Sequence, residues 1–177
     1  MAKYTIQKSG SHIHWTGKKV LGLHTGSIDL QEGFVGLEQD NILSGSIIID
    51  MSTIIITDMD DLPEKNQFFQ HLLHEDFFDV ERYKQARLVI TGSSFLSDRL
   101  YEVKANVTIK DITHPVTFET TIEIFTDYLL ATGELSIDRT LYNIRYGSGK
   151  FLENLGDKLI YDHFVLQFKL IGRRHSV

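Results

Sequence analysis

The sequence contains no cysteine, and its 177 residues include only two prolines. Without thiols the chain can form neither disulfides nor thiolate metal sites, and it has no cysteine nucleophile. Because the glycines are spread along the chain and prolines are so few, nothing resembles a Pro-rich or Ser-rich linker between two domains. The length suits one domain of ordinary size, so we expect residues 1–177 to form a single domain.

Long apolar runs are also missing. No stretch approaches the ~20 apolar residues of a membrane-spanning helix, and the opening residues MAKYTIQKSGSHIHW lack the apolar core of a secretion signal. We therefore expect no membrane span and a cytoplasmic location, or a periplasmic one if a signal peptide has been removed. The 18 basic residues are scattered and the net charge is -6, so we expect no nucleic-acid partner.

Apolar and polar residues alternate with a period of two in the second half of the sequence. This alternation is typical of strands with one buried face. In residues 103–110 the apolar face holds Val103, Ala105, Val107 and Ile109. Similar runs cover 116–124, 129–137 and 160–170. Shorter candidates precede them at Ile13 and Trp15, 27–30, 45–50 and 86–91.

About eight such segments with turns between them predict an antiparallel sandwich or barrel, and a closed barrel has no exposed edge strands. We therefore expect an all-β fold of about eight antiparallel strands, with a barrel preferred over a sandwich. Thr120 is the one polar residue on the apolar face of its segment. Pro115 is expected to open a strand after a tight turn at 111–114, where its missing N–H has no cost.

One segment has helical spacing instead. Pro63 suits a first helical turn and Glu64 lies near the positive end of the helix dipole, which predicts a helix from Pro63 to about Leu73. Its apolar stripe holds Phe68, Phe69, Leu72 and Leu73, and Phe77 and Phe78 follow directly. Because this stripe has to be covered, we expect the helix to lie near the barrel mouth.

Histidines and carboxylates supply the candidate metal ligands. His71 and His74 lie three residues apart and precede Glu75 and Asp76, which would suit a metal-assisted hydrolase or isomerase. The H-E-x-x-H motif is not formed, and a solvated polar helix face also accounts for both histidines. Neither the His12-x-His14 pair nor the acids of residues 50–61 have further ligands at a diagnostic spacing. Since the G-x-S-x-G motif of a serine nucleophile is also missing, we predict no catalytic residue and no metal site.

Six strings in order along the chain are similar to those of the YceI family. They are W-T-G-K-K at 15–19, G-L-H-T-G at 22–26, I-D-M-S at 49–52, H-L-L-H-E-D-F-F-D-V-E-R-Y at 71–83, V-T-I-K-D-I-T-H-P-V-T-F at 107–118 and D-R-T-x-Y-x-I-R-Y-G-S-G-K-F at 138–151. No single string is diagnostic, but six in sequence cover almost the whole chain. We therefore regard the chain as resembling this lipocalin-like, polyisoprenoid-binding family.

The resemblance implies an eight-stranded lipocalin-like barrel with a short helix near its opening, a long apolar pocket and a homodimer. The implied function is to bind and carry or sequester a long apolar amphipathic ligand, such as a polyisoprenoid, an isoprenoid quinone or a fatty amide. This is lipid binding and transport rather than catalysis, with no cofactor besides the bound lipid. The alternatives are the hydrolase or isomerase using His71 and His74, and a stress-related scaffold whose barrel interior is solid.

Within this hypothesis the inward-facing strand residues bind the ligand chain and the helical segment forms a lid. The expected apolar lining comprises Val107, Ile109, Phe118, Ile122, Leu135, Ile137, Phe164, Leu166 and Phe168, with the lid residues Phe68, Phe69, Leu72, Phe77 and Phe78. A polar head group would require donors and cations at the mouth. The candidates within or next to the matched strings are Lys19, His24, His71, Lys110, Arg139, Arg145 and Tyr146.

Overall fold

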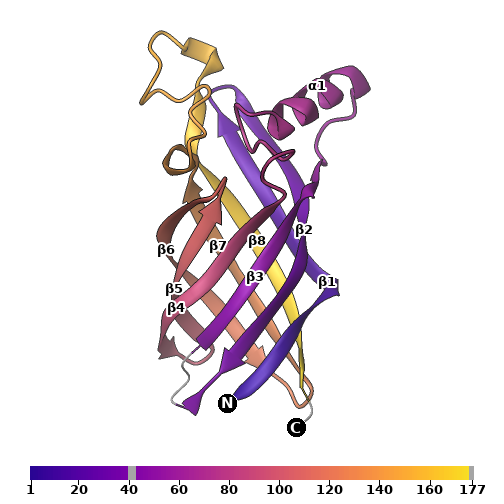
Figure 1. The fold of residues 1–177 in the computed structure, drawn as a ribbon, viewed down its shortest axis with the longest axis vertical. Helices are drawn as coiled ribbons and strands as arrows, with labels where there is room; N and C mark the ends of the chain where they lie inside the picture. Colours follow the sequence, from indigo (N-terminus) through magenta and orange to yellow (C-terminus); the bar gives the residue numbers. More distant parts are fainter. Residues whose placement is uncertain (40–42, 176–177) are drawn as a thin grey trace.

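Alternating apolar residues close the chain into a β-barrel. The computed structural model describes residues 1–39 and 43–175, and within them eight antiparallel strands each pair with their chain neighbours while β8 returns to β1 (Figure 1). The strands are β1 (Ala2–Lys19), β2 (Gly22–Leu37), β3 (Leu43–Ile56), β4 (Gln85–Ser97), β5 (Leu100–Ile109), β6 (Ile112–Ile124), β7 (Tyr128–Asp138) and β8 (Ile160–Arg174). The predicted fold class is confirmed.

The period-two pattern predicts the inward face of β5 correctly. Its four apolar residues at 103, 105, 107 and 109 are each no more than 6% exposed. Thr120 in β6 is also buried among apolar neighbours, and its hydroxyl donates to the carbonyl of Thr132 at 3.0 Å. Ile124 is an error of the pattern, because it lies at the end of β6 and is 48% exposed.

The first strands are much longer than the sequence indicated. β1 runs for 18 residues and β2 for 16, where we expected short, irregular segments. The pairing of β1 with β2 shifts register between Thr5 and Ile13, and Gly10 within that interval has a φ of +83°. Because a bulge moves later residues to the opposite face, it breaks the period-two pattern and conceals a continuous strand.

The turn before Pro115 was predicted wrongly. The chain reverses at Lys110 and Asp111, which both have positive φ (+52° and +59°), as a two-residue hairpin turn requires. Pro115 therefore lies inside β6 rather than at its start. Pro115 lies opposite Asn106 at a position where the backbone nitrogen of β6 points away from β5. On its other side β6 pairs with β7 only from Thr120 onward. The missing N–H of Pro115 consequently leaves no ladder hydrogen bond unmade.

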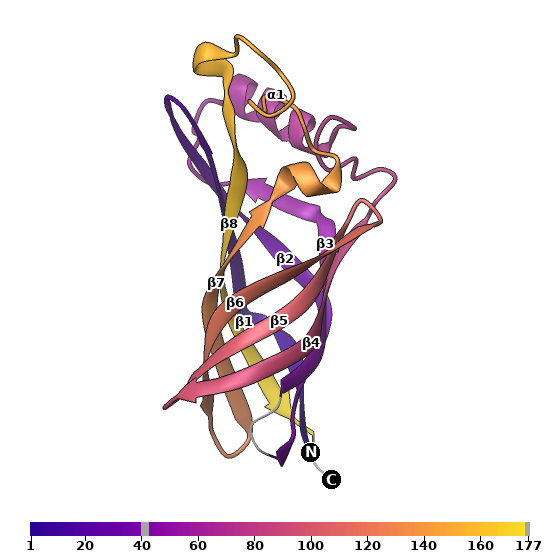
Figure 2. The same ribbon diagram turned by 90° about the vertical axis from the view of Figure 1, so that its left-hand side faces the viewer.

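One end of the barrel, called the mouth here, carries the non-strand elements. Helix α1 (Leu62–Leu73) and the long β7–β8 connection with η2 (Arg139–Tyr142) and η3 (Gly156–Lys158) lie there, while the chain termini lie at the opposite end (Figures 1 and 2). The predicted helix and its position near the mouth are confirmed. In the described part of the chain no helix is long and apolar enough to cross a membrane.

Candidate functional site

The barrel interior is hollow. A cavity of about 730 Å³ extends along it, and all eight strands contribute to its wall. Every predicted lining residue except Phe69 lies on this wall: Val107, Ile109, Phe118, Ile122, Leu135, Ile137, Phe164, Leu166, Phe168, Phe68, Leu72, Phe77 and Phe78. Phe69 packs against the hydrophobic core instead. The chain therefore encloses a space of the size that ligand sites have.

The first three strands also form a large part of the cavity wall. Sequence reasoning missed these residues, which include Trp15, Ile28, Val35, Ile47, Met51 and Ile54. All six are buried hydrophobic residues. The sequence does contain these apolar residues. The bulge in β1 and the register shifts between β2 and β3 interrupt the period-two alternation, so the sequence pattern does not show that they face the same side.

Trp15 is held where Gly26 of β2 and Ile55 of β3 approach each other closely. Its indole Nε1 donates to the carbonyl of Ile55 at 3.2 Å, and the ring lies over Gly26 of β2. A Cβ at Gly26 would overlap the carbonyl oxygen of Ile55 and lie 2.5 Å from the Trp15 ring. The second glycine of the G-L-H-T-G string therefore makes room for this tryptophan.

We expect Gly26→Ala to lower the free energy of unfolding by about 1–3 kcal/mol, because the added methyl group overpacks a rigid site. Urea denaturation monitored by circular dichroism measures this change. Gly17→Ala in the adjoining W-T-G-K-K string is the matched control, since a Cβ there meets no atom within 4 Å. Equal stability of both variants would show that the contact at Gly26 relaxes without cost.

Helix α1 and the segment after it cover the mouth. Leu72 and Phe77 are each 6% exposed, and Phe78 meets Phe164 of β8 edge to face at 6.2 Å. His71 also lines the cavity, and its ring lies 4.8 Å from that of Phe77. The lid predicted from the apolar stripe is thus built mainly from one side of the helix and the two phenylalanines that follow it.

Polar side chains gather where the cavity opens beside α1. Lys19, His24 and His71 from the predicted head-group set all line the cavity, together with Lys18 and Gln67. The His24 ring lies 4.8 Å from that of Phe68 on the helix. His24 Nδ1 also lies 3.0 Å from a carboxylate oxygen of Asp58, which holds the imidazole at the rim. The mouth can therefore present both cationic and neutral hydrogen-bonding groups to a ligand.

Arg139 borders the cavity but its guanidinium is already engaged. The side chain is 4% exposed and donates to four backbone carbonyls at 2.8–3.1 Å, those of Ile144, Tyr146, Ile160 and Tyr161. Burial lowers the pKa of Arg139, while the carboxylates of Asp162 and Asp138 oppose that shift. We therefore assign Arg139 to holding the β7–β8 connection together rather than to the ligand.

Neighbouring residues of the same string complete this polar cluster. Asp138 accepts hydrogen bonds from the N–H and hydroxyl of Thr140 and from Lys150 Nζ at 3.0 Å. Burial raises the pKa of Asp138, but these hydrogen bonds outweigh it and hold that pKa below its usual value. Ser148, fully buried, donates to Asp162 at 2.6 Å. The residues of the D-R-T-x-Y-x-I-R-Y-G-S-G-K-F string therefore stabilise the β7–β8 connection at the mouth.

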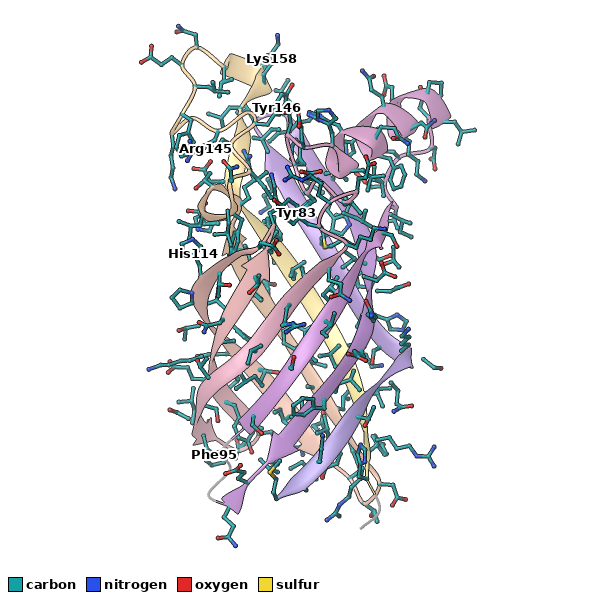
Figure 3. The ribbon with its side chains drawn as sticks, in the orientation of Figure 1. Tyr83, Phe95, His114, Arg145, Tyr146 and Lys158 are labelled. Carbon is teal, nitrogen blue, oxygen red and sulfur yellow. The ribbon has the colours of Figure 1, made fainter. Side chains whose placement is uncertain are left out.

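The three remaining head-group candidates lie outside the cavity. Lys110, Arg145 and Tyr146 border a separate polar pocket of about 510 Å³. Lys110 is 8% exposed and donates to the carbonyls of Glu75 and Asn143 at 3.1 and 3.3 Å. Burial lowers the pKa of Lys110, and nearby carboxylates oppose the shift. Arg145 and Tyr146 are labelled near the mouth in Figure 3. The Arg145 guanidinium lies 4.4 Å from the ring centre of Phe151.

The histidines considered as metal ligands do not share a helix face. Helix α1 ends at Leu73, so His74 lies beyond it with a side chain 56% exposed. Asp76 lies 3.4 Å from His74 Nδ1 and 4.0 Å from His71 Nε2. Across residues 1–39 and 43–175, no group of three or more His, Asp or Glu side chains is arranged to hold a metal ion.

A closed antiparallel barrel with an apolar interior cavity and a helix across its mouth defines a class of small barrels that hold ligands inside. Within this class the particular family is also established. The sequence matches the YceI-like domain over residues 4–171, and the chain belongs to that family. The resemblance noted in the six strings is confirmed.

Solved structures of low sequence identity have the same fold. BcnA of Burkholderia cenocepacia is 20% identical with a TM-score of 0.74, covering 94% of this chain and 98% of that one. A polyisoprenoid binding domain from Saccharophagus degradans is 14% identical with a TM-score of 0.68, covering 97% and 98%. The YCEI protein of Campylobacter jejuni is 10% identical with a TM-score of 0.60, covering 80% of each chain. No curated protein matches the sequence.

Proposed function

We propose that this chain binds one long, apolar, amphipathic molecule of the isoprenoid type inside the barrel and carries or sequesters it. The observation that carries this proposal is the cavity of about 730 Å³, whose wall is mainly apolar. Each methylene group moved from water into such a space contributes about 0.8 kcal/mol. A long prenyl or acyl chain would therefore bind tightly with few polar contacts.

The polar end of the ligand would lie at the mouth. Lys19, His24 and His71 line the cavity there, whereas Thr120 is a polar residue of the deep wall whose hydroxyl is already paired. An isoprenoid quinone, a prenyl phosphate and a fatty amide all combine a long chain with hydrogen-bond acceptors. The Saccharophagus degradans neighbour, a polyisoprenoid binding domain, supports the isoprenoid class among these.

Binding without chemical conversion is part of the proposal. The buried cation next to the cavity, Arg139, directs its N–H groups to backbone carbonyls rather than into the cavity. The homodimer and the cytoplasmic or periplasmic location expected from the sequence stay predictions.

Organic extraction of the purified protein followed by mass spectrometry tests the proposal, with native mass spectrometry to count ligands and subunits. We expect one polyprenyl, quinone or fatty-amide molecule per chain. A protein that is purified empty and also takes up no added isoprenoid would overturn the proposal. Metal analysis of the same sample would then test the hydrolase or isomerase alternative.

A further inference from the structure

The turn between β1 and β2 projects at the mouth end (Figure 2), and its apolar side chains are exposed. Val20 is 46% exposed, Leu21 71% and Leu23 49%. Leu21 is thus more exposed than most large apolar residues of this chain, although a polar turn would close the hairpin equally well. Exposed apolar groups that cluster on one site indicate an interaction surface.

Further exposed apolar residues lie at the same end. The N–H of Val20 donates to the carbonyl of Leu159 at 3.3 Å, which joins the hairpin turn to the β7–β8 connection. That connection exposes Phe151 and Leu152, and the start of α1 exposes Leu62. We call these six side chains the mouth rim: Val20, Leu21, Leu23, Leu62, Phe151 and Leu152.

The mouth rim is continuous with the cavity through two lysines. Lys18 and Lys19 immediately precede the exposed turn, and both line the cavity. A lysine can lay its apolar stem along hydrocarbon while its ammonium group reaches a phosphate. The combination of exposed apolar side chains with adjacent lysines is the chemistry that binds the interface of a phospholipid bilayer.

The opposite end of the barrel also exposes apolar residues, but in a different setting. Phe95 and Leu96 are 45% and 47% exposed, and Phe95 is labelled at the end away from the mouth in Figure 3. Neither residue lines the cavity. Asp98 follows in the turn, and Glu123 is paired with Arg99 beside it. This end therefore lacks the connection to the interior, although basic side chains, Arg173 and Arg174 of β8, also lie near it.

We propose that the mouth rim docks on a lipid bilayer, with the β1–β2 turn inserted among the head groups and Lys18 and Lys19 on lipid phosphates. This inference rests on the proposed function. In that orientation the cavity opens onto the membrane, so an apolar chain moves between bilayer and barrel without exposing its methylene groups to water. The bilayer is thus both the partner of this surface and the source or destination of the ligand.

The test uses vesicles of phosphatidylcholine and phosphatidylglycerol and a pyrene-labelled isoprenoid alcohol as the probe. Transfer of the probe from loaded protein to vesicles is compared for the wild type, the double variant Val20→Glu with Leu21→Glu, and the control pair Phe95→Glu with Leu96→Glu. We expect the rim variant to transfer about tenfold more slowly and to stop co-floating with vesicles, because two carboxylates oppose insertion. The control pair should behave as the wild type does.

Loading the probe in the absence of vesicles tests the proposed ligand binding separately from the proposed docking on a bilayer. If the wild type takes up no probe in the absence of vesicles, the proposed function is overturned. If all proteins load equally and the rim variant transfers at the wild-type rate, only the docking inference is overturned. The same conclusion follows if the rim variant turns a dimer into a monomer in native mass spectrometry with transfer unchanged, because a second copy of the chain would then cover the rim.

Discussion

Replacing Val107 with tryptophan is expected to empty the barrel of lipid while leaving it folded. Val107 lies on the inward face of β5, is 4% exposed and lines the cavity. The larger indole would occupy space that the ligand chain needs. Because the side chain points into a cavity rather than a filled core, the loss of stability should stay within the about 1–3 kcal/mol typical of overpacking.

Asn106→Trp is the matched control for Val107→Trp. Asn106 is the preceding residue of the same strand and its side chain is exposed on the outer face, so it adds the same indole without entering the cavity. Extraction and mass spectrometry should find bound lipid in the control at the wild-type level and a reduction of about tenfold or more in Val107→Trp. A folded Val107→Trp protein with full lipid occupancy would contradict the assignment of this cavity as the ligand site.

Arg139→Met is expected to have the largest effect on stability, about 3–5 kcal/mol, because it removes a buried cation and leaves its partners unpaired. Four carbonyls lose their donor. The carboxylates of Asp138 and Asp162 lose the compensating charge beside them. Urea denaturation at neutral pH, where wild-type Arg139 is charged, measures the difference in the free energy of unfolding.

Arg145→Met provides the control for Arg139→Met, since the Arg145 guanidinium lies over the exposed ring of Phe151 and donates to no buried carbonyl in the described residues. Its effect should be small, within about 0.5 kcal/mol. If Arg139→Met instead keeps wild-type stability but loses lipid, Arg139 contacts the head group, as the sequence had suggested.

Residues 103–170 show how far sequence patterns reach. The sequence predicts four consecutive strands there because apolar and polar residues alternate along most of each segment, with exceptions such as Thr120 and Val165. The helix was predicted equally well, since Pro63 lies in its first turn and the apolar residues Phe68, Phe69, Leu72 and Leu73 repeat at helical spacing. Both predictions depend only on neighbours along the chain, which is why a single sequence sufficed.

The cation candidates at the mouth show where such reasoning ends. The matched strings predict head-group contacts for their lysines and arginines, but Arg139 donates to backbone carbonyls and Lys110 lies in a separate pocket. Which partner a buried cation finds depends on carbonyls that come from distant positions in the chain. No local pattern contains that information.

The sequence by itself determined the strands, the helix and the inward direction of nearly all predicted lining residues, because periodicity and turn residues are local properties, while the six matched strings indicated the family and its barrel. Only the tertiary structure decided that the barrel is hollow, since alternating apolar residues fill a solid core just as well as they line a cavity. It also decided which polar groups reach the mouth and that Val20 and Leu21 are left exposed beside it. These features arise from how strands far apart in the chain close on one another, and closure is a property of the whole barrel.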